Sequence, residues 1–360
     1  MKTKLILSSG PTNISDSTLK KLQEHYTNQD LDNSFKEIYK KTISLYNKLI
    51  KNYKGETIFM TAEAMLALES ACLNFIEKGD KVLIVANGIF GEGFEDLAKN
   101  VGADTKVLKF DWDKGFDTAE IIKELDKDNY KVVTMVHCET PTGITNDVKT
   151  VCQELRKRKI LSIVDSVSAI AGEEINFDTD CIDVLLGGSQ KCLSLPADLG
   201  FISLSREAIH YLHNRENVNS YYLNLLSYIK AQRENRFLYT QCIGTIMALK
   251  NKLENLQETD FVKVHREYAE MVRNRLKEKG FEIYGKDSLS NTVTAFYPPK
   301  NISADKLFNK LLEEHNIVVS GGLGILNGKI LRIGHMGDNN RKEFFELLFS
   351  AIDQIMEEVR

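Results

Sequence analysis

The sequence has few prolines, no paired cysteines and no long apolar run. Its 360 residues include five prolines, and its six cysteines are scattered without a Cys-x-x-Cys pair. Neither a disulfide framework nor a zinc site can be read from such spacing, and reduced thiols are typical of the cytoplasm. The apolar run at residues 5–7 is too short for a signal peptide and meets Gly10-Pro11 at once. No apolar stretch approaches membrane-spanning length. We therefore expect a cytoplasmic protein with no metal and no membrane partner.

An excess of charge of one sign is also missing. The net charge is −4 and the pI is about 6.1, which gives no indication of a nucleic-acid or acidic-membrane partner. The lysine-rich stretches at residues 36–41 and 156–159 lie within or beside helical pattern and indicate solvated helix faces. The chain is 42% hydrophobic. Because single cores stop growing at about 250–300 residues, this length predicts two domains.

What the sequence does contain is a regular alternation of short apolar runs and amphipathic stretches between residues 59 and 205. This alternation predicts an α/β fold with a mostly parallel sheet covered by helices on both faces. In such sheets ligands bind beyond the carboxyl ends of the strands. The expected strands span residues 57–61, 82–86, 105–110, 132–136, 161–165, 184–187 and 200–204, and the helices between them residues 66–77, 91–100, 118–125 and 148–158.

The pattern changes after residue 206. Helices are expected over residues 221–229, 243–256 and 261–279, followed by a smaller α+β unit. We predict a large α/β domain over residues 15–256 and a small α+β domain over residues 257–360, to which residues 1–14 return. In the small unit, strands are expected over residues 291–297, 317–320 and 329–333, with helices over residues 303–314 and 341–358.

Lys191 and Asp165 both follow predicted strands. Asp165 ends one apolar run, and Lys191 lies in the small-residue loop Gly187-Gly188-Ser189-Gln190-Lys191 after another. A lysine amine and an acidic partner for a pyridinium nitrogen are what pyridoxal phosphate (PLP) needs from a protein. On these two residues alone, a solvated lysine and a helix-capping aspartate are an equal alternative.

Three further motifs favour the cofactor interpretation. They are Asp165-Ser166-Val167-Ser168, Gly188-Ser189-Gln190-Lys191, and Gly321-Gly322-Leu323-Gly324 followed by Arg332-Ile333-Gly334. In their order and spacing, the chain resembles the class V (fold-type I) PLP-dependent aminotransferases over nearly its whole length. The likeness is to the branch of alanine–glyoxylate, serine–pyruvate and 2-aminoethylphosphonate–pyruvate transaminases.

The resemblance implies a role for each matching residue. Lys191 would form the Schiff base with the cofactor and later move the substrate proton, and Asp165 would keep the pyridine nitrogen protonated. Phe90 would stack on one face of the ring and Val167 on the other. Thr140 would lie near the phenolic oxygen.

The phosphate cup departs from the family pattern, because Glu63 occupies a position where small or hydroxylated residues are usual. The backbone amides of Ala64 and Met65 would still cradle the phosphate, with an amide contact from Gln190. A carboxylate facing a phosphate is repulsive, so Glu63 is expected to cap the following helix or to meet the substrate amine.

The resemblance also implies a homodimer with shared active sites. Tyr239 matches a residue that reaches the phosphate of the neighbouring subunit, and Cys242 stands where a hydroxyl is usual. Arg332 would bind the substrate carboxylate with its guanidinium fork. Ser9 and Gly10, together with Ser320, would line the substrate pocket.

These roles predict an aminotransferase that moves an amino group from a small donor such as alanine or serine to pyruvate or glyoxylate. A 2-aminoethylphosphonate donor stays open, because Arg233 and Arg236 would either offer added cations for its phosphonate or lie on a helix surface. A PLP lyase or cysteine desulfurase is disfavoured, because Gln190 replaces the usual histidine before the lysine and no cysteine follows Cys242. A non-enzymatic protein of the same fold would not need Lys191, Asp165 and Arg332 together.

Overall fold

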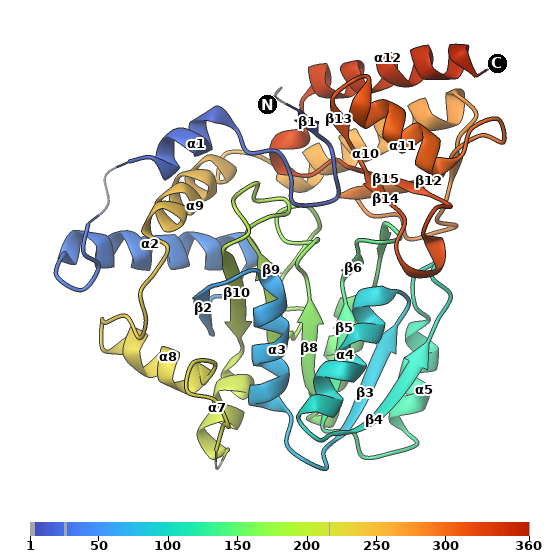
Figure 1. Ribbon diagram of the computed structural model, residues 1–360. Coiled ribbons are helices and arrows are strands. Elements are labelled where there is room, and N and C mark those ends of the chain that lie inside the picture. Colours follow the sequence, from blue (N-terminus) through green and yellow to red (C-terminus); the bar gives the residue numbers. More distant parts are fainter. Residues whose placement is uncertain (1–3, 25–26, 216, 360) are drawn as a thin grey trace.

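The computed structural model describes residues 4–24, 27–215 and 217–359, and its centre is a seven-stranded sheet (Figure 1). The strand order is β2-β10-β9-β8-β5-β3-β4, and only β10 runs antiparallel to its neighbours within this sheet. The prediction of a mostly parallel α/β sheet is therefore confirmed. Its strands are β2 (Glu56–Thr61), β3 (Lys81–Ala86), β4 (Asp104–Lys109), β5 (Val132–Val136), β8 (Leu161–Asp165), β9 (Val184–Gly188) and β10 (Leu199–Leu204).

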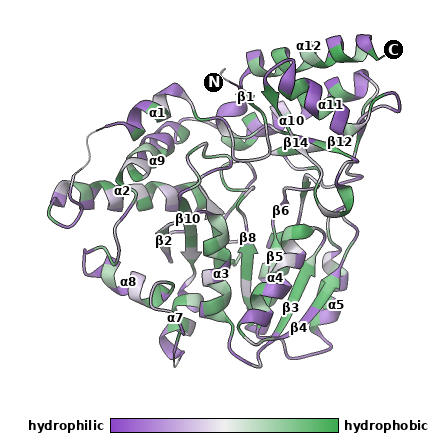
Figure 2. Cartoon of the chain, viewed as in Figure 1, coloured by the Kyte–Doolittle hydropathy of each residue, from purple (hydrophilic) through white to green (hydrophobic). Residues whose placement is uncertain are grey.

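Helices cover both faces of this sheet because its strands are apolar on both sides. In β3, Val82 and Ile84 pack into one hydrophobic cluster, and Leu83 and Val85 pack into the cluster on the opposite face. Figure 2 shows the hydrophobic colour concentrated along the central strands. One face is covered by α3 (Ala64–Phe75), α4 (Ile89–Asn100), α7 (Arg206–Asn214) and α8 (Leu225–Arg233), and the other by α2 (Asn33–Ile50), α5 (Thr118–Leu125), α6 (Val148–Arg158) and α9 (Ile243–Leu256).

A smaller antiparallel sheet of order β11-β12-β15-β14 lies in the C-terminal part and packs with helices in a separate hydrophobic cluster. The N-terminal strand β1 pairs in parallel with β13 next to it. The predicted domain limits themselves stay a prediction, and residues 1–3 of that assignment lie outside the described residues. The elements are β1 (Leu5–Ile6), β11 (Glu282–Ile283), β12 (Val293–Tyr297), β13 (Ile317–Val318), β14 (Ser320–Gly321), β15 (Leu331–Gly334), α10 (Phe261–Glu278), α11 (Ala304–Glu313) and α12 (Lys342–Glu358).

Short elements complete the chain. Helix α1 (Asp16–Leu22) packs with α9, and β6 (Cys138–Glu139) pairs with β7 (Ile144–Thr145) just after β5. Two 3-10 turns, η1 (Gly324–Leu326) and η2 (Gly337–Asn339), flank β15. Within the described ranges, no helix has both the length and the apolar character needed to cross a membrane.

Two sequence predictions in the C-terminal half were wrong in detail. The helix expected over residues 221–229 begins at Leu225, because Asn224 caps it by accepting a hydrogen bond from Ser227 N. The strand expected over residues 317–320 is divided between two sheets, since β13 pairs with β1 and β14 pairs with β15. Both differences depend on partners that are distant in the sequence.

The carboxyl ends of β2, β3, β5, β8 and β9 meet at one edge of the central sheet, and the smaller sheet lies over this edge (Figure 1). Loops from both parts of the chain therefore converge there. The segment between β14 and β15 comes down toward α4, where a side chain on Gly324 would contact Ile89 and Trp112.

Candidate active site

The loops that follow five strands enclose a cavity at the carboxyl edge of the sheet. Nine residues predicted for the cofactor site line it, and they come from the ends of β2, β3, β5, β8 and β9. The full lining consists of Glu63, Ala64, Met65, Leu68, Phe90, Cys138, Thr140, Asp165, Val167, Ser168, Gln190 and Lys191. The strand-end position of these residues explains why segments more than a hundred residues apart meet at one cavity.

Lys191 projects into this cavity and touches the N-terminal segment. Its Nζ donates a 2.7 Å hydrogen bond to the carbonyl oxygen of Ser9. Burial lowers the pKa of Lys191 to about 8, and the positive charge of Arg332 contributes to the shift. The amine is therefore neutral in part of the molecules near neutral pH, which a nucleophile or a base requires.

The backbone at Gly10 approaches Lys191 so closely that no side chain fits there. A Cβ at this position would lie 2.3 Å from Lys191 Cδ and 2.6 Å from Nζ. The φ angle of Gly10 is also +100°, which L-residues rarely adopt. Ser9 is held in turn by Ser320, whose Oγ accepts hydrogen bonds from the Ser9 amide (2.9 Å) and hydroxyl (3.0 Å).

Asp165 is buried at the end of β8, with 5% of its surface exposed. Its Oδ1 accepts a 2.9 Å hydrogen bond from Val167 N. Burial raises the pKa of Asp165 to about 6, while the Val167 amide and the charge of Lys191 act in the opposite direction. A buried carboxylate of this kind is stabilised by a cation, and a protonated ring nitrogen would supply one.

Arg332, on β15, lies beside the cavity without being one of its lining residues, and its guanidinium is hydrogen-bonded to β14 and to the turn of Thr140. Its Nε donates to Gly321 O (2.9 Å) and its Nη1 donates to Thr140 O (3.1 Å). Burial lowers the pKa of Arg332 to about 10, so the guanidinium remains charged at neutral pH. Because Nε and one N–H of Nη1 are occupied, a carboxylate would be bound end-on by the remaining N–H groups of Nη1 and Nη2.

The loop after β5 and the loop after β8 are joined by a hydrogen bond between the hydroxyl groups of Thr140 and Ser168. This bond orients the Thr140 hydroxyl at the cavity wall. Val167 and Phe90 are both partly buried lining residues on the same apolar cluster. Their side chains therefore form the apolar part of the wall.

Helix α3 begins at the cavity with Glu63 as its N-cap. The exposed Glu63 side chain accepts a 3.0 Å hydrogen bond from Met65 N, so the capping alternative predicted for this residue is confirmed. Next to it, Gln190 Oε1 is buried without a hydrogen-bond partner. A side chain on Gly188 would lie 2.6 Å from that oxygen and 2.8 Å from the Ala64 methyl group. The expected phosphate cup is therefore narrow at its base, and the Gln190 side chain makes this base polar.

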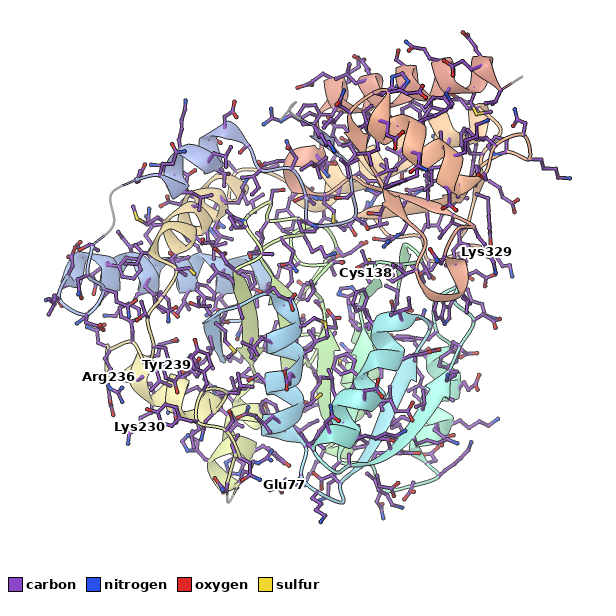
Figure 3. All side chains as sticks on the ribbon, in the orientation of Figure 1. Glu77, Cys138, Lys230, Arg236, Tyr239 and Lys329 are labelled. Carbon is purple, nitrogen blue, oxygen red and sulfur yellow. The ribbon has the colours of Figure 1, made fainter. Side chains whose placement is uncertain are left out.

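Tyr239 and Cys242 are not among the residues that line the cavity of their own chain. Tyr239 stacks on Tyr222 with ring centroids 4.2 Å apart, and its hydroxyl donates to Tyr221 O at 2.7 Å. Figure 3 shows Tyr239 and Arg236 beside α8, at a distance from Cys138 beneath the smaller sheet.

Three lining residues, Leu68, Cys138 and Ser168, were not predicted from the sequence, and Glu139 was given no role. Leu68 lies one helical turn after Ala64, so helical periodicity alone would have placed it on the cavity side. Cys138 and Ser168 each lie within three residues of a strand end, where a search of all strand-end residues would have found them.

Comparison with known proteins agrees with this geometry. A family model described as aminotransferase class-V matches residues 5–333. An uncharacterized aminotransferase of Methanocaldococcus jannaschii is 33% identical over 355 residues, which cover 96% of this chain and 91% of that protein. The (S)-ureidoglycine–glyoxylate transaminase of Bacillus subtilis is 28% identical over 376 residues, covering 98% of this chain and 90% of that protein. The crystal structure of an alanine–glyoxylate aminotransferase from Nostoc sp. matches with a TM-score of 0.95 at 29% identity, covering 99% of this chain and 96% of that chain.

Proposed function

Because this chain belongs to the class-V aminotransferases, we propose that it moves the amino group of a small donor, of the alanine or serine type, to a small 2-oxo acid such as glyoxylate or pyruvate. The observation that carries the proposal is the shared cavity of Lys191 and Asp165, to which Arg332 is joined through Thr140 O at 3.1 Å. An amine, an acid and a carboxylate-binding cation are thus available around one cavity.

The residues at the cavity fit pyridoxal phosphate, the cofactor of this family. Gly10 lets the backbone pack directly against Lys191, where any Cβ would collide with the lysine side chain. Gln190 Oε1 has no hydrogen-bond partner within the described residues, and the Nε2 of the same side chain would donate to the phosphate. The buried Asp165 would provide the acidic partner that the ring nitrogen requires. Lys191, Asp165, Phe90, Val167 and Thr140 would hold the ring, while Gln190 and the amides of Ala64 and Met65 would hold the phosphate.

When bound, pyridoxal phosphate supplies an aldehyde for the donor amine and a ring that withdraws electrons from its α-carbon. The protein supplies the remaining functions. Lys191 Nζ, with its lowered pKa, would accept the α-proton of the donor and pass it to C4′ of the cofactor, and it would carry a proton in the reverse direction when the 2-oxo acid is aminated. Asp165 would hold a proton on the ring nitrogen, and the guanidinium of Arg332 would bind the substrate carboxylate.

The charges around the cavity favour a monocarboxylate donor over 2-aminoethylphosphonate. Arg233 donates to Glu56 at 2.8 Å and Arg236 donates to Glu234 at 2.7 Å, and both arginines are exposed on the surface of their own chain. Neither lines the cavity of its own chain, so within one chain neither supplies the added cation that the dianionic phosphonate needs. The two relatives with named substrates both act on glyoxylate by their names, which supports a small 2-oxo acid as acceptor.

A desulfurase function is not supported by the cysteines at the site. Cys138 lines the cavity, but burial raises the pKa of its thiol to about 12. Cys192 follows Lys191 directly, and burial raises the pKa of its thiol as well. Because the thiolate is the reactive form, neither residue is suited to attack sulfur at neutral pH.

We also propose a homodimer whose subunits complete each other's sites. The aromatic residues around Tyr239 support this proposal, since Tyr221 is 90% exposed and Tyr222 is 38% exposed. Exposed aromatic residues gathered in this way are typical of protein interfaces. Tyr239 and Cys242, which lie outside the cavity of their own chain, would then face the phosphate of the partner.

A donor screen on the purified, PLP-loaded protein tests the substrate assignment. Alanine, serine, aspartate and 2-aminoethylphosphonate would be added one at a time, and conversion of the cofactor to its pyridoxamine form would be followed by absorbance. We expect rapid conversion with alanine or serine and reversal by glyoxylate or pyruvate. Conversion by 2-aminoethylphosphonate alone would contradict the proposal in favour of the phosphonate donor.

Mixing two inactive variants tests the shared site. Lys191→Ala and Tyr239→Ala would be purified separately, unfolded together and refolded as a mixture. In a hybrid dimer, one site would combine an intact Lys191 with an intact Tyr239 from the other subunit, so activity should return. Absence of any recovery, with refolded wild type active, would contradict the sharing of Tyr239.

A further inference from the structure

Helix α4, which carries Phe90 to the cavity, begins without an N-cap side chain of its own. Its N-cap residue is Gly88, which makes no side-chain capping bond. The Glu139 carboxylate from β6 takes that place, accepting hydrogen bonds from Gly91 N (2.7 Å) and Phe90 N (3.4 Å). When Glu139 is ionised, its negative charge also faces the positive end of the helix dipole.

The absence of a side chain at Gly88 is what admits the carboxylate. A Cβ on Gly88 would lie 2.4 Å from Glu139 Cδ and 2.5 Å from its Oε2, and these are the nearest atoms to that position. The backbone of Gly88 is extended, with φ 177° and ψ −176°, so its conformation does not itself require glycine. The glycine is explained by the space that Glu139 needs.

Glu139 is also the first residue of the turn that carries Thr140. Its carbonyl oxygen accepts hydrogen bonds from Gly143 N (2.8 Å) and Thr142 N (3.2 Å). The next residue, Thr140, receives Arg332 on its carbonyl and binds Ser168 through its hydroxyl. The side chain of Glu139 therefore connects α4 to the turn that supports the polar wall of the cavity.

This carboxylate is fully buried and carries no counter-ion in the hydrogen bonds described above. Burial raises the pKa of Glu139 to about 8, and the negative charges of Asp165 and Glu92 add to the shift, while the amides of Gly91 and Phe90 oppose it. Burying a carboxylate without a counter-ion costs free energy, and hydrogen bonds to the carboxylate offset part of that cost. Here these hydrogen bonds come from two backbone amides of α4, the helix that carries Phe90.

We propose that Glu139 is a positioning residue for the cofactor ring: it fixes the first turn of α4, and with it Phe90, relative to the turn of Thr140. This inference rests on the proposed function, since it assumes that pyridoxal phosphate binds between Phe90 and Val167. It assigns to Glu139 no contact with substrate or cofactor.

Three substitutions separate this role from a merely structural one. Glu139→Ala removes both capping bonds. Glu139→Gln keeps one acceptor oxygen for Gly91 N but turns an NH2 group toward Phe90 N–H, so it disturbs Phe90 alone. Glu173→Gln is the matched control, because burial raises the pKa of Glu173 to about 7 and its carboxylate accepts from Ser290 Oγ (2.8 Å) and Asn291 N (2.6 Å), which belong neither to α4 nor to the cavity lining.

The measurements are the thermal midpoint, kcat, and the circular dichroism of the visible band of bound PLP, which reports how asymmetrically the ring is held. We expect Glu139→Ala and Glu139→Gln to weaken this dichroism and to lower kcat by on the order of 10- to 100-fold, with a smaller change in KM, because a misplaced ring loses reactive geometry. Glu173→Gln should lower the thermal midpoint while leaving the dichroism of the band unchanged.

A second-site change gives an independent check. Gly88→Ser should clash with Glu139 in the wild type, but in the Glu139→Ala background it fills the vacated space and supplies a local N-cap. The double variant should therefore regain dichroism and kcat relative to Glu139→Ala. Wild-type dichroism and kcat in both Glu139 variants would overturn the inference. A wild-type protein that binds no PLP would instead overturn the proposed function, and the inference with it.

Discussion

The amine of Lys191 and the carbonyl oxygen of Ser9 are joined by a 2.7 Å hydrogen bond, so the N-terminal segment closes directly over the lysine. This contact joins residues that are 182 positions apart. It depends on the conformation of Gly10, the next residue, whose backbone approaches Lys191 without a side chain between them. The N-terminal segment is thus part of the active site as well as of the sheet that β1 forms with β13.

Gly10→Ala should therefore impair the site as well as the fold. Its positive φ costs any L-residue about 1–2 kcal/mol, and the added methyl group would collide with Lys191. Gly79→Ala is the matched control, since Gly79 has φ +86° and nothing within 4 Å of its Cβ position. Both variants should lose similar free energy of unfolding from the backbone, but only Gly10→Ala should lose PLP affinity and kcat. Equal PLP affinity in the two variants would contradict the contact.

Removing the side-chain amine of Lys191 should abolish transamination. Lys191→Ala purified from cells should lack the yellow colour of the bound cofactor, and transamination should fall by more than about 10³-fold, because covalent capture and proton transfer are lost together. Lys230→Ala, which removes an exposed lysine on α8, is the control (Figure 3). Transamination retained in Lys191→Ala would exclude Lys191 as the base.

The rate at which the cofactor-free protein captures PLP should rise with pH. Only the neutral amine attacks the aldehyde, and the pKa of Lys191 is lowered to about 8. The neutral fraction is about one half at pH 8 and about one hundredth at pH 6, so capture should slow by about 50-fold over this range. Stopped-flow absorbance measures the rate.

Arg332→Ala tests whether the lowered pKa of Lys191 sets the pH dependence of PLP capture. The charge of Arg332 helps to lower the pKa of Lys191, so its removal should move the midpoint of the pH profile upward. A capture rate that is constant between pH 6 and pH 8 would contradict the lowered pKa.

The same substitution should weaken substrate binding. Arg332→Ala should raise KM for carboxylate substrates by about 10- to 100-fold, equivalent to about 1.4–2.8 kcal/mol, with a smaller effect on kcat. Arg332→Lys should restore little, because a lysine lacks the planar fork and cannot bind Gly321 O, Thr140 O and a carboxylate at once. Arg236→Ala, on the surface, should leave KM unchanged. Unaltered KM in Arg332→Ala would remove its proposed role.

The strands of the central sheet were predictable because apolar periodicity and length are local properties. All seven begin and end within one residue of the predicted bounds, and Lys191 and Asp165 could be placed at strand ends from the same pattern. What could not be predicted depends on distant partners. The start of α8 is fixed in part by Asn74, which accepts from Leu225 N across 151 positions. The capping of α4 by Glu139 spans 48 positions, so nothing near Glu139 in the sequence indicates it.

Glu63, the residue that departs from the family pattern, should have opposite effects on stability and on cofactor binding. It caps α3 through Met65 N, so Glu63→Ala should lower the free energy of unfolding by about 1 kcal/mol. Its carboxylate also lines the cavity near the amides proposed to hold the phosphate. Removing a like charge there should tighten PLP binding by about fivefold, since such a repulsion is about 1 kcal/mol in water.

Glu63→Ser separates the two effects, because serine caps a helix without a charge. It should keep wild-type stability and still bind PLP more tightly, whereas Glu69→Ala, an exposed change on the same helix, should alter neither property. Equilibrium titration of the cofactor-free protein gives the affinities, and thermal unfolding gives the stabilities. If PLP binds Glu63→Ser no more tightly than the wild type, the carboxylate is directed away from the phosphate and acts on the helix alone.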